Sequence, residues 1–188
     1  MRVNLARSWF NVTTLPIFLV AAITFSEIAS PDDPKLFFRP VLTLEIAKAI
    51  AEACESRQIK QKKPPVSIAI YDQGVDLVLF HRMAGAPLGA VIVAMEKGKT
   101  SASFPVSTKQ WKIAAFGENG TQGIAHLPNI TTIEGGVPIV TQDGVHLGGI
   151  GVSGSSGEDD EACAKAGLGV VEKSFIVKSY NKQELGIK

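Results

Sequence analysis

Two pairs of short apolar runs, each joined by a turn sequence that ends in Gly, constrain this chain more than any other feature. The runs are rich in β-branched residues and cover residues 66–71, 75–80, 137–141 and 145–152. The later pair flanks Gln142-Asp143-Gly144, and Asp-Gly between apolar runs favours a tight turn with positive φ. The earlier pair flanks Asp72-Gln73-Gly74, which is also turn chemistry. The sequence therefore predicts two hairpins of antiparallel strands.

Segments with helical spacing of apolar residues lie before, between and after these hairpins. They cover residues 44–63, 86–104, 108–116 and 158–173. Thr43 and Ser107 are predicted to cap the first and third helices, and Pro64 and Pro105 to stop the first and second. Because amphipathic helices must bury one face, this order predicts an α+β fold, a single domain in which helices flank an antiparallel sheet.

The first 26 residues follow the order of a signal peptide. Two arginines precede an apolar run over residues 15–25, and polarity returns from Ser26. The run is well short of the roughly 20 residues that a membrane-spanning helix needs. We therefore expect an exported protein, periplasmic or extracellular, without a stable membrane span. An N-terminal arm that packs on a neighbour is the alternative.

The remaining boundaries follow from composition. Residues 27–40 are predicted to be a linker, residues 41–176 the folded domain and residues 177–188 a C-terminal tail. Lys and Arg number 19 against 18 Asp and Glu, and a net charge of +1 offers no broad electrostatic footprint for nucleic acid. We therefore expect no nucleic-acid partner.

The chain has two cysteines, Cys54 and Cys163, without a Cys-x-x-Cys motif or a Cys/His cluster at zinc spacing. Neither a zinc site nor a disulfide framework is indicated. The pair is interpreted either as two buried thiols or as one disulfide. Export would permit the disulfide if the two Cα atoms come within about 7 Å.

Residues that could bind or catalyse are few and scattered. The histidines are His81, His126 and His146, too far apart in sequence to predict a metal motif. His81 ends the second predicted strand and His126 lies in the irregular segment 117–129, so both could border one pocket as a ligand or an acid or base. A solvated histidine is the alternative for each. Lys97, flanked by apolar positions on the second helix, could hold a ligand carboxylate or extend to solvent.

Two further motifs are predicted to be structural. Residues 151–157 lack the last glycine of the Gly-x-Ser-x-Gly nucleophile elbow and are interpreted as a turn. The acidic residues 158–161 are interpreted as the start of the last helix, because carboxylates favour the positive end of a helix dipole. Consecutive helical side chains point in different directions, so no metal site is expected there.

Seven segments, in this order and spacing, together resemble the GlcG/HbpS-like family. They cover residues 42–47, 66–72, 82–87, 96–100, 134–139, 148–154 and 160–164. The resemblance implies a profilin-like fold, with about five antiparallel strands and helices packed against them. It also implies assembly into dimers or larger rings and a small-molecule ligand. Members of the family include haem binders and proteins of glycolate, aromatic-degradation and diol-utilisation operons.

The ligands of the exported haem-binding members are not all matched. Their haem-linked threonine aligns with Ile130, and Thr131 lies next to it. The acidic pair that takes iron in those members aligns with Ile92 and Met95. The resemblance therefore implies no such iron site, and we expect no metal site here.

We predict an exported homo-oligomer that binds or senses haem by ligation, without turnover. Haem needs an apolar slot, an axial ligand and a cation for its propionates. His81, His126 or Thr131 is expected to supply the axial ligand. Lys97 is expected to supply the cation, and Glu134 is a further candidate for the pocket, because the resemblance matches both to common positions of the family.

Two alternatives stay open. One is a small-molecule enzyme that acts on an aromatic-degradation or hydroxy-acid intermediate, in which Lys97, His126 and Glu134 transfer protons. The other is a non-catalytic module that binds a partner through its helix surfaces. A fold of this kind hosts unrelated functions, so fold alone does not choose between them.

Overall fold

The computed structural model describes residues 39–171 of the chain. The predicted signal peptide, nearly all of the predicted linker and the predicted C-terminal tail lie outside the described residues. Apart from Arg39 and Pro40, the described residues fall within the predicted domain. Among them, no helix combines the length and the hydropathy needed to cross a bilayer.

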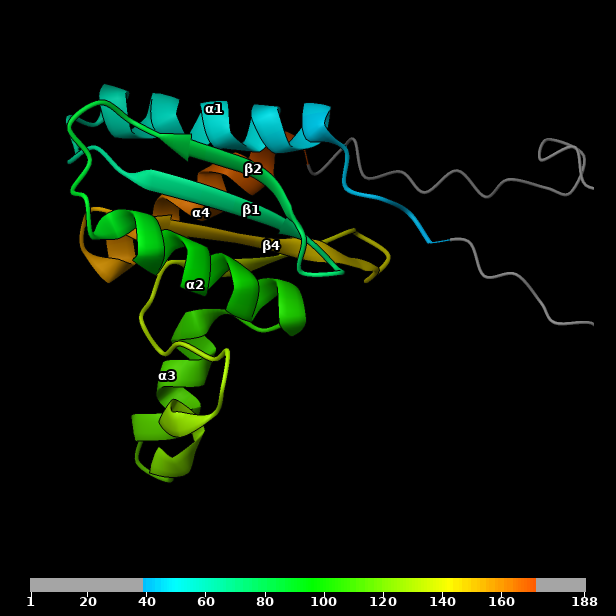
Figure 1. The fold of residues 1–188 in the computed structure, drawn as a ribbon, viewed down its shortest axis with the longest axis vertical. Helices are drawn as coiled ribbons and strands as arrows, with labels where there is room; N and C mark the ends of the chain where they lie inside the picture. The colour runs from blue at the N-terminus through cyan, green and yellow to red at the C-terminus, as the bar shows by residue number, and fades with distance from the viewer. Residues whose placement is uncertain (1–38, 172–188) are drawn as a thin grey trace, which may run out of the picture. The chain divides into compact units, whose positions relative to one another are not determined.

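Helices and hairpins alternate in the predicted order (Figure 1). The helices are α1 (Leu44–Lys60), α2 (Ala90–Ser103), α3 (Thr108–Phe116), the short 3-10 helix η1 (Gln122–His126) and α4 (Gly157–Val171). The strands are β1 (Ser67–Asp72), β2 (Leu77–Arg82), β3 (Gly136–Val140) and β4 (His146–Ser153). Both predicted hairpins are present, β1 with β2 and β3 with β4, and the predicted α+β class is confirmed.

The strands form one antiparallel sheet in the order β2-β1-β4-β3. The hairpins meet where β1 pairs with β4, and Ile68 lies opposite Val152 there. The described residues hold four strands in this sheet, one fewer than the family resemblance implied. Residues 130–135, which lead into β3, form no strand of their own. Instead, the N–H of Thr131 donates to the hydroxyl of Thr100 on α2, at 3.0 Å.

The predicted caps form, but several predicted boundaries shift, since α1 ends at Lys60 and not at residue 63, and β2 covers Leu77–Arg82 and not residues 75–80. The hydroxyls of Thr43 and Ser107 accept backbone N–H groups at the starts of α1 and α3. The prediction that the second helix begins near residue 86 is wrong, because α2 begins at Ala90. The N–H of Ala86 instead donates to the carbonyl of Met83, and its own carbonyl accepts from the Arg82 guanidinium. These bonds hold a turn ahead of the helix.

The two faces of the sheet are packed differently. α1 and α4 cover one face and α2 covers the other (Figure 1). Under α1 and α4 the core holds large side chains, among them Ile50, Ile68, Ile70, Ile139, Ile150 and Val152. Under α2, a Cβ on Gly151 of β4 would meet the backbone of Ala94 and Gly98. Glycine therefore lets α2 lie directly on β4, and this brings Lys97 to the end of that strand.

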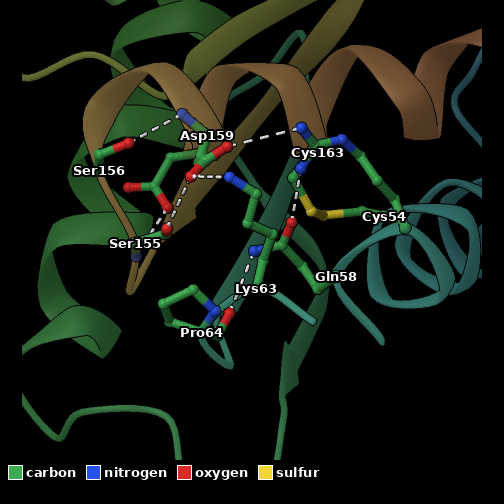
Figure 2. A network of polar contacts seen from close by, with 10 residues as sticks. Cys54, Gln58, Lys63, Pro64, Ser155, Ser156, Asp159 and Cys163 are labelled. Atoms are coloured by element: carbon green, nitrogen blue, oxygen red, sulfur yellow. Dashed lines mark hydrogen bonds and ion pairs between the residues drawn. A yellow bond between two sulfur atoms is a disulfide. The ribbon is translucent and has the colours of Figure 1, made fainter. Parts of the chain in front are cut away.

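A disulfide joins the two helices on the first face. Cys54 of α1 is bonded to Cys163 of α4, with Cα atoms 4.7 Å apart (Figure 2). The sequence left open two buried thiols or one disulfide, and the structure contains the disulfide. Close by, Lys63 Nζ donates to Asp159 Oδ2 at 2.9 Å, and Arg57 lies 3.6 Å from the other carboxylate oxygen. One covalent and two ionic contacts therefore hold the start of α4 to the end of α1.

Candidate functional site

The loop that enters β3 turns at Glu134 and Gly135, and we call these two residues the Glu134 corner. Three helices meet it. Lys97 of α2 lies beneath Gly135, and Lys112 of α3 donates to Glu134. Gly157, at the start of α4, is so close that a Cβ there would lie 2.9 Å from the Cβ of Glu134. The corner therefore joins segments that are far apart in the sequence.

An ion pair is sealed on the inner side of the corner. The side chains of Lys97 and Asp160 are 1% and 2% exposed. Lys97 Nζ donates to Asp160 Oδ2 at 2.9 Å and to the carbonyl oxygen of Val152 at 2.7 Å. The other oxygen of Asp160 accepts the backbone N–H of Ser155 at 3.0 Å. Lys97 does not extend to solvent, because its ammonium is held by oxygen atoms inside the domain.

Gly135 closes this ion pair from above. Its φ of 123° lies in the region that favours glycine. A Cβ at Gly135 would lie 2.6 Å from the carbonyl oxygen of Val152 and 2.8 Å from Lys97 Nζ. The carbonyl of Gly135 also accepts the N–H of Val152 at 2.9 Å. The lysine, the strand end and the corner therefore form one packed unit.

Burial pushes both members of the sealed pair toward their neutral forms. Desolvation lowers the pKa of Lys97, against the opposing effects of Asp160 and Glu134. Desolvation raises the pKa of Asp160, against Lys97 and two backbone N–H groups. Either charge left alone in this place would be uncompensated, so each residue depends on the other.

A second ion pair is open on the outer side of the corner. Lys112 Nζ donates to Glu134 Oε1 at 2.9 Å, and Lys109 Nζ lies 3.8 Å from Glu134 Oε2. The side chains of Lys112 and Lys109 are 54% and 46% exposed. The hydrogen bond from Lys112 lowers the pKa of Glu134. This carboxylate is therefore ionised and is held between two ammonium groups at the surface.

The same side of α3 is apolar beyond the lysines. Lys109, Lys112, Ile113 and Phe116 recur at helical spacing, and we call them the α3 stripe. Ile113 and Phe116 are 60% and 57% exposed. Ile133, which precedes Glu134, and Leu127, which follows η1, are also exposed, and η1 packs on α3. Large apolar side chains gathered on neighbouring segments indicate a contact surface.

Two further predicted residues lie in this region. His126 ends η1 and is exposed, and within residues 39–171 it has no hydrogen bond or ion pair. Thr131 is half-buried, and its hydroxyl accepts the N–H of Ile133 at 3.3 Å. The structure thus gathers Lys97, Thr131 and Glu134 around α2 and the loop into β3, while His126 lies on η1 against α3.

His81 is set apart from this group. It lies on the edge strand β2 opposite Ile68, whose side chain belongs to the core under α1 and α4. Its Nε2 atom lies 3.0 Å from Glu55 Oε2 on α1. Because opposed residues of paired strands share a face, His81 is on the side of the sheet away from α2.

A groove also opens on the side of the disulfide. It measures about 420 Å³ and lies between the later parts of α1 and α4, lined by Ala53, Ser56, Arg57, Lys60, Gln61, Ala166 and Val170. None of the residues predicted from the sequence to bind ligand lines this groove. It is therefore not the site that the sequence pattern indicates.

Sequence reasoning missed the partner of Lys97. The acidic residues 158–161 do open α4, as predicted, but Asp160 turns inward while Asp159 stays near the surface. A signal was available. A lysine among apolar helix positions is rarely buried without a carboxylate partner, and only some of four consecutive helical carboxylates can face inward.

The positions that align with the family's iron ligands carry no acid. Ile92 on α2 is exposed, and Met95 packs against the small cluster around Ala69 and Tyr71. Across residues 39–171, no three side chains of His, Cys, Asp or Glu gather in a way that could hold a metal ion.

Most of this domain matches known proteins. Residues 42–169 match the family model described as "Haem degrading protein HbpS-like". Protein GlcG of Escherichia coli K12 is 34% identical over 113 residues, which cover 60% of this chain and 81% of that protein.

Solved structures agree with the fold. The crystal structure of HbpS superposes with a TM-score of 0.66 at 29% identity and covers 76% of this chain and 98% of its own. A PduOC complex with haem superposes with a TM-score of 0.63 at 24% identity and covers 69% of this chain and 94% of its own. At that identity the PduOC likeness concerns the fold alone. Together these likenesses confirm an antiparallel sheet flanked by helices.

Proposed function

The chain belongs to the HbpS-like family, and from that premise we propose that it is an exported, self-associating protein that binds haem at the α3 stripe. The observation that carries this proposal is that α3 and the adjoining η1 carry exposed apolar side chains, two lysines and an exposed histidine. Haem is a flat apolar group with two carboxylates, and it needs an axial ligand. The residues present fit these needs.

The axial ligand in this proposal is His126. Its imidazole is exposed at the end of η1 and, within the described chain, is not committed to another polar group. Neutral imidazole is a common ligand of haem iron, whereas His81 already faces Glu55. Thr131 is the second candidate, and its hydroxyl first has to release the N–H of Ile133. Bound haem would supply an iron centre.

Lys97 acts indirectly in this proposal. Its ammonium is 1% exposed and is held by Asp160 and Val152, so a ligand carboxylate has no direct access to it. It lies under Gly135 and supports the corner that carries Glu134. We therefore assign Lys97 as a positioning residue of the haem site.

Export and self-association are parts of the same proposal. The bridge between Cys54 and Cys163 supports export, because disulfides persist in oxidising compartments. The exposed apolar residues of α3 and of the segment after η1 support association, since a surface of this kind can also receive a neighbouring copy. N-terminal sequencing of protein from the cell exterior and light scattering with and without haemin test these two parts.

Titration of the full chain with haemin, followed in the Soret region, tests haem binding. We expect a saturable Soret band that His126→Ala shifts or weakens, because the axial ligand is removed. His81→Ala is the matched control and should leave the band unchanged. The proposal fails if haemin produces no saturable band with the unaltered protein.

The sealed ion pair favours a second candidate, an enzyme that transfers protons to or from a small hydroxy acid. Lys97 and Asp160 have pKa values displaced by burial, and such residues often belong to catalytic sites. In that case Glu134, ionised at the surface, would exchange the proton with substrate. Proton NMR in D2O should then show loss of the α-proton signal of a hydroxy acid, and Glu134→Gln should prevent it. A persistent signal with the unaltered protein would exclude this activity for that acid.

A further inference from the structure

Both lysines of α3 pair with a single carboxylate of the same chain. The two oxygens of Glu134 face two lysines, Lys112 at 2.9 Å and Lys109 at 3.8 Å. Two positive charges surround one carboxylate, so this place keeps an excess of one positive charge. It is therefore able to attract a further anion.

The contacts of Glu134 with these lysines are exchangeable. Both ammonium groups lie on side chains that are about half exposed. Ion pairs in such a position contribute little net stability, because water and salt compete with them. A carboxylate that brings additional contacts of its own can therefore replace Glu134 on the lysines.

The surroundings indicate what kind of molecule would bring those contacts. Ile113 and Phe116 continue the α3 stripe beyond the lysines, and Ile133 stands next to Glu134. A ligand with carboxylates on a flat apolar body would place its carboxylates on the ammonium groups and its apolar body on these side chains. Inorganic anions and small hydrophilic acids would gain only the ionic part.

We propose that Lys109 and Lys112 form the binding site for the carboxylates of an amphipathic dicarboxylate ligand, and that Glu134 is an internal carboxylate which the ligand displaces. This inference rests on the proposed function and assigns the residues that recognise the propionates of haem. Glu134 then acts as a competitor that weakens binding, while the lysines strengthen it. The opposite signs of these two effects distinguish the proposal from a general role of the corner in folding.

The α2 helix provides a matched control. Lys99 Nζ lies 3.0 Å from Glu96 Oε1, and both side chains are partly exposed like the pair at the corner. Glu96→Gln changes the net charge of the protein by the same amount as Glu134→Gln, and Lys99→Gln changes it by half as much as the double exchange of Lys109 and Lys112. Long-range electrostatic effects on an anionic ligand are therefore matched for Glu134→Gln, and for the double variant they should be about the square of the fold-change that Lys99→Gln causes.

The experiment measures the dissociation constants of haemin and of haemin dimethyl ester, which lacks free carboxylates, for the full chain and its variants. We expect Glu134→Gln to bind haemin about threefold more tightly, and the double variant Lys109→Gln, Lys112→Gln to bind it about tenfold more weakly. The ester should bind all of these proteins equally. Glu96→Gln and Lys99→Gln should change the haemin constants by less than about twofold.

The outcomes separate this inference from the proposed function. If haemin binds saturably but the corner variants match their α2 controls, the proposed carboxylate-binding site is wrong and the proposal of haem binding stands. If the lysine variants weaken the binding of haemin and of its ester alike, the lysines support the fold and do not recognise carboxylates. The proposed carboxylate-binding site is then also wrong. If the unaltered protein binds neither compound, the proposed function and the inference both fail.

Discussion

The two ion pairs of the Glu134 corner have the same separation and very different surroundings. Lys97 and Asp160 are 2.9 Å apart and almost fully buried, and Lys112 and Glu134 are 2.9 Å apart with the lysine half exposed. Inside the domain, loss of one partner leaves a charge without water to solvate it. At the surface, water replaces the missing partner. Burial, and not distance, therefore decides that the first pair supports the fold and that the second can exchange its partner for a ligand.

The largest effect should come from breaking the sealed pair. Lys97→Met leaves the Asp160 carboxylate buried without its cation, and we expect the free energy of unfolding to fall by about 3–5 kcal/mol. Urea denaturation followed by circular dichroism measures this loss. Adding Asp160→Asn should restore part of it, because the second exchange removes the stranded charge. A loss below about 1 kcal/mol for Lys97→Met would contradict the comparison, since that is the range of surface pairs.

Removing the disulfide should have the next largest effect. Cys54 and Cys163 are 109 residues apart in the sequence, and the cross-link restricts the unfolded chain. We expect Cys54→Ala with Cys163→Ala to cost about 2–4 kcal/mol in the free energy of unfolding. Haemin affinity should not change, because the bridge lies on the face of α1 and α4. A matching loss of haemin affinity would mean that the two faces are not independent.

Gly135→Ala tests how tightly the backbone of the corner packs on the sealed ion pair. The added Cβ meets the carbonyl oxygen of Val152 and Lys97 Nζ, and φ at this position is unfavourable for alanine. We expect a loss of about 1–3 kcal/mol, measured by the same denaturation. Gly123→Ala on η1 is the control, since a Cβ there would meet nothing within 4 Å. Equal stability of the two variants would show that the corner is not tightly packed on the sealed pair.

The smallest effects should come from the open pair. Lys112→Met should change the free energy of unfolding by less than about 1 kcal/mol. It should also return the pKa of Glu134 toward the ordinary value, because the hydrogen bond from Lys112 is what lowers it. A folded-state pKa below the unfolded one contributes stability at higher pH that is lost as pH falls through the folded pKa. NMR titration of the Glu134 carboxyl measures this shift, and an unchanged pKa would show that the pair does not form in solution.

Local patterns were sufficient to predict most of the fold. The Asp143-Gly144 turn and the capping residues Thr43 and Ser107 act within a few residues, and each has the predicted result, whereas α1 ends at Lys60, ahead of the predicted stop at Pro64. The number of strands came from the family resemblance and not from a local pattern. It is one too high for the described residues, in which the two hairpins predicted from local patterns account for all four strands of the sheet.

The site could be predicted only in part, because its contacts join distant segments. Lys97, Gly135 and Asp160 lie on three separate elements, and no spacing in the sequence shows that they touch. Lys97 and Glu134 were predicted as candidates for a ligand pocket, but the sequence did not indicate that Lys97 faces the interior and Glu134 the surface. That difference depends on the side of Gly135 on which each side chain lies, and only the packed structure specifies it.

Hydrogen exchange of the full chain with and without haemin tests whether the ligand binds on the α3 side of the corner. We expect slower amide exchange in α3, η1 and the loop that leads to Glu134, with α1 and β2 unchanged. Slower exchange in β2 and α1, around His81 and Glu55, with no change in α3, would contradict this expectation.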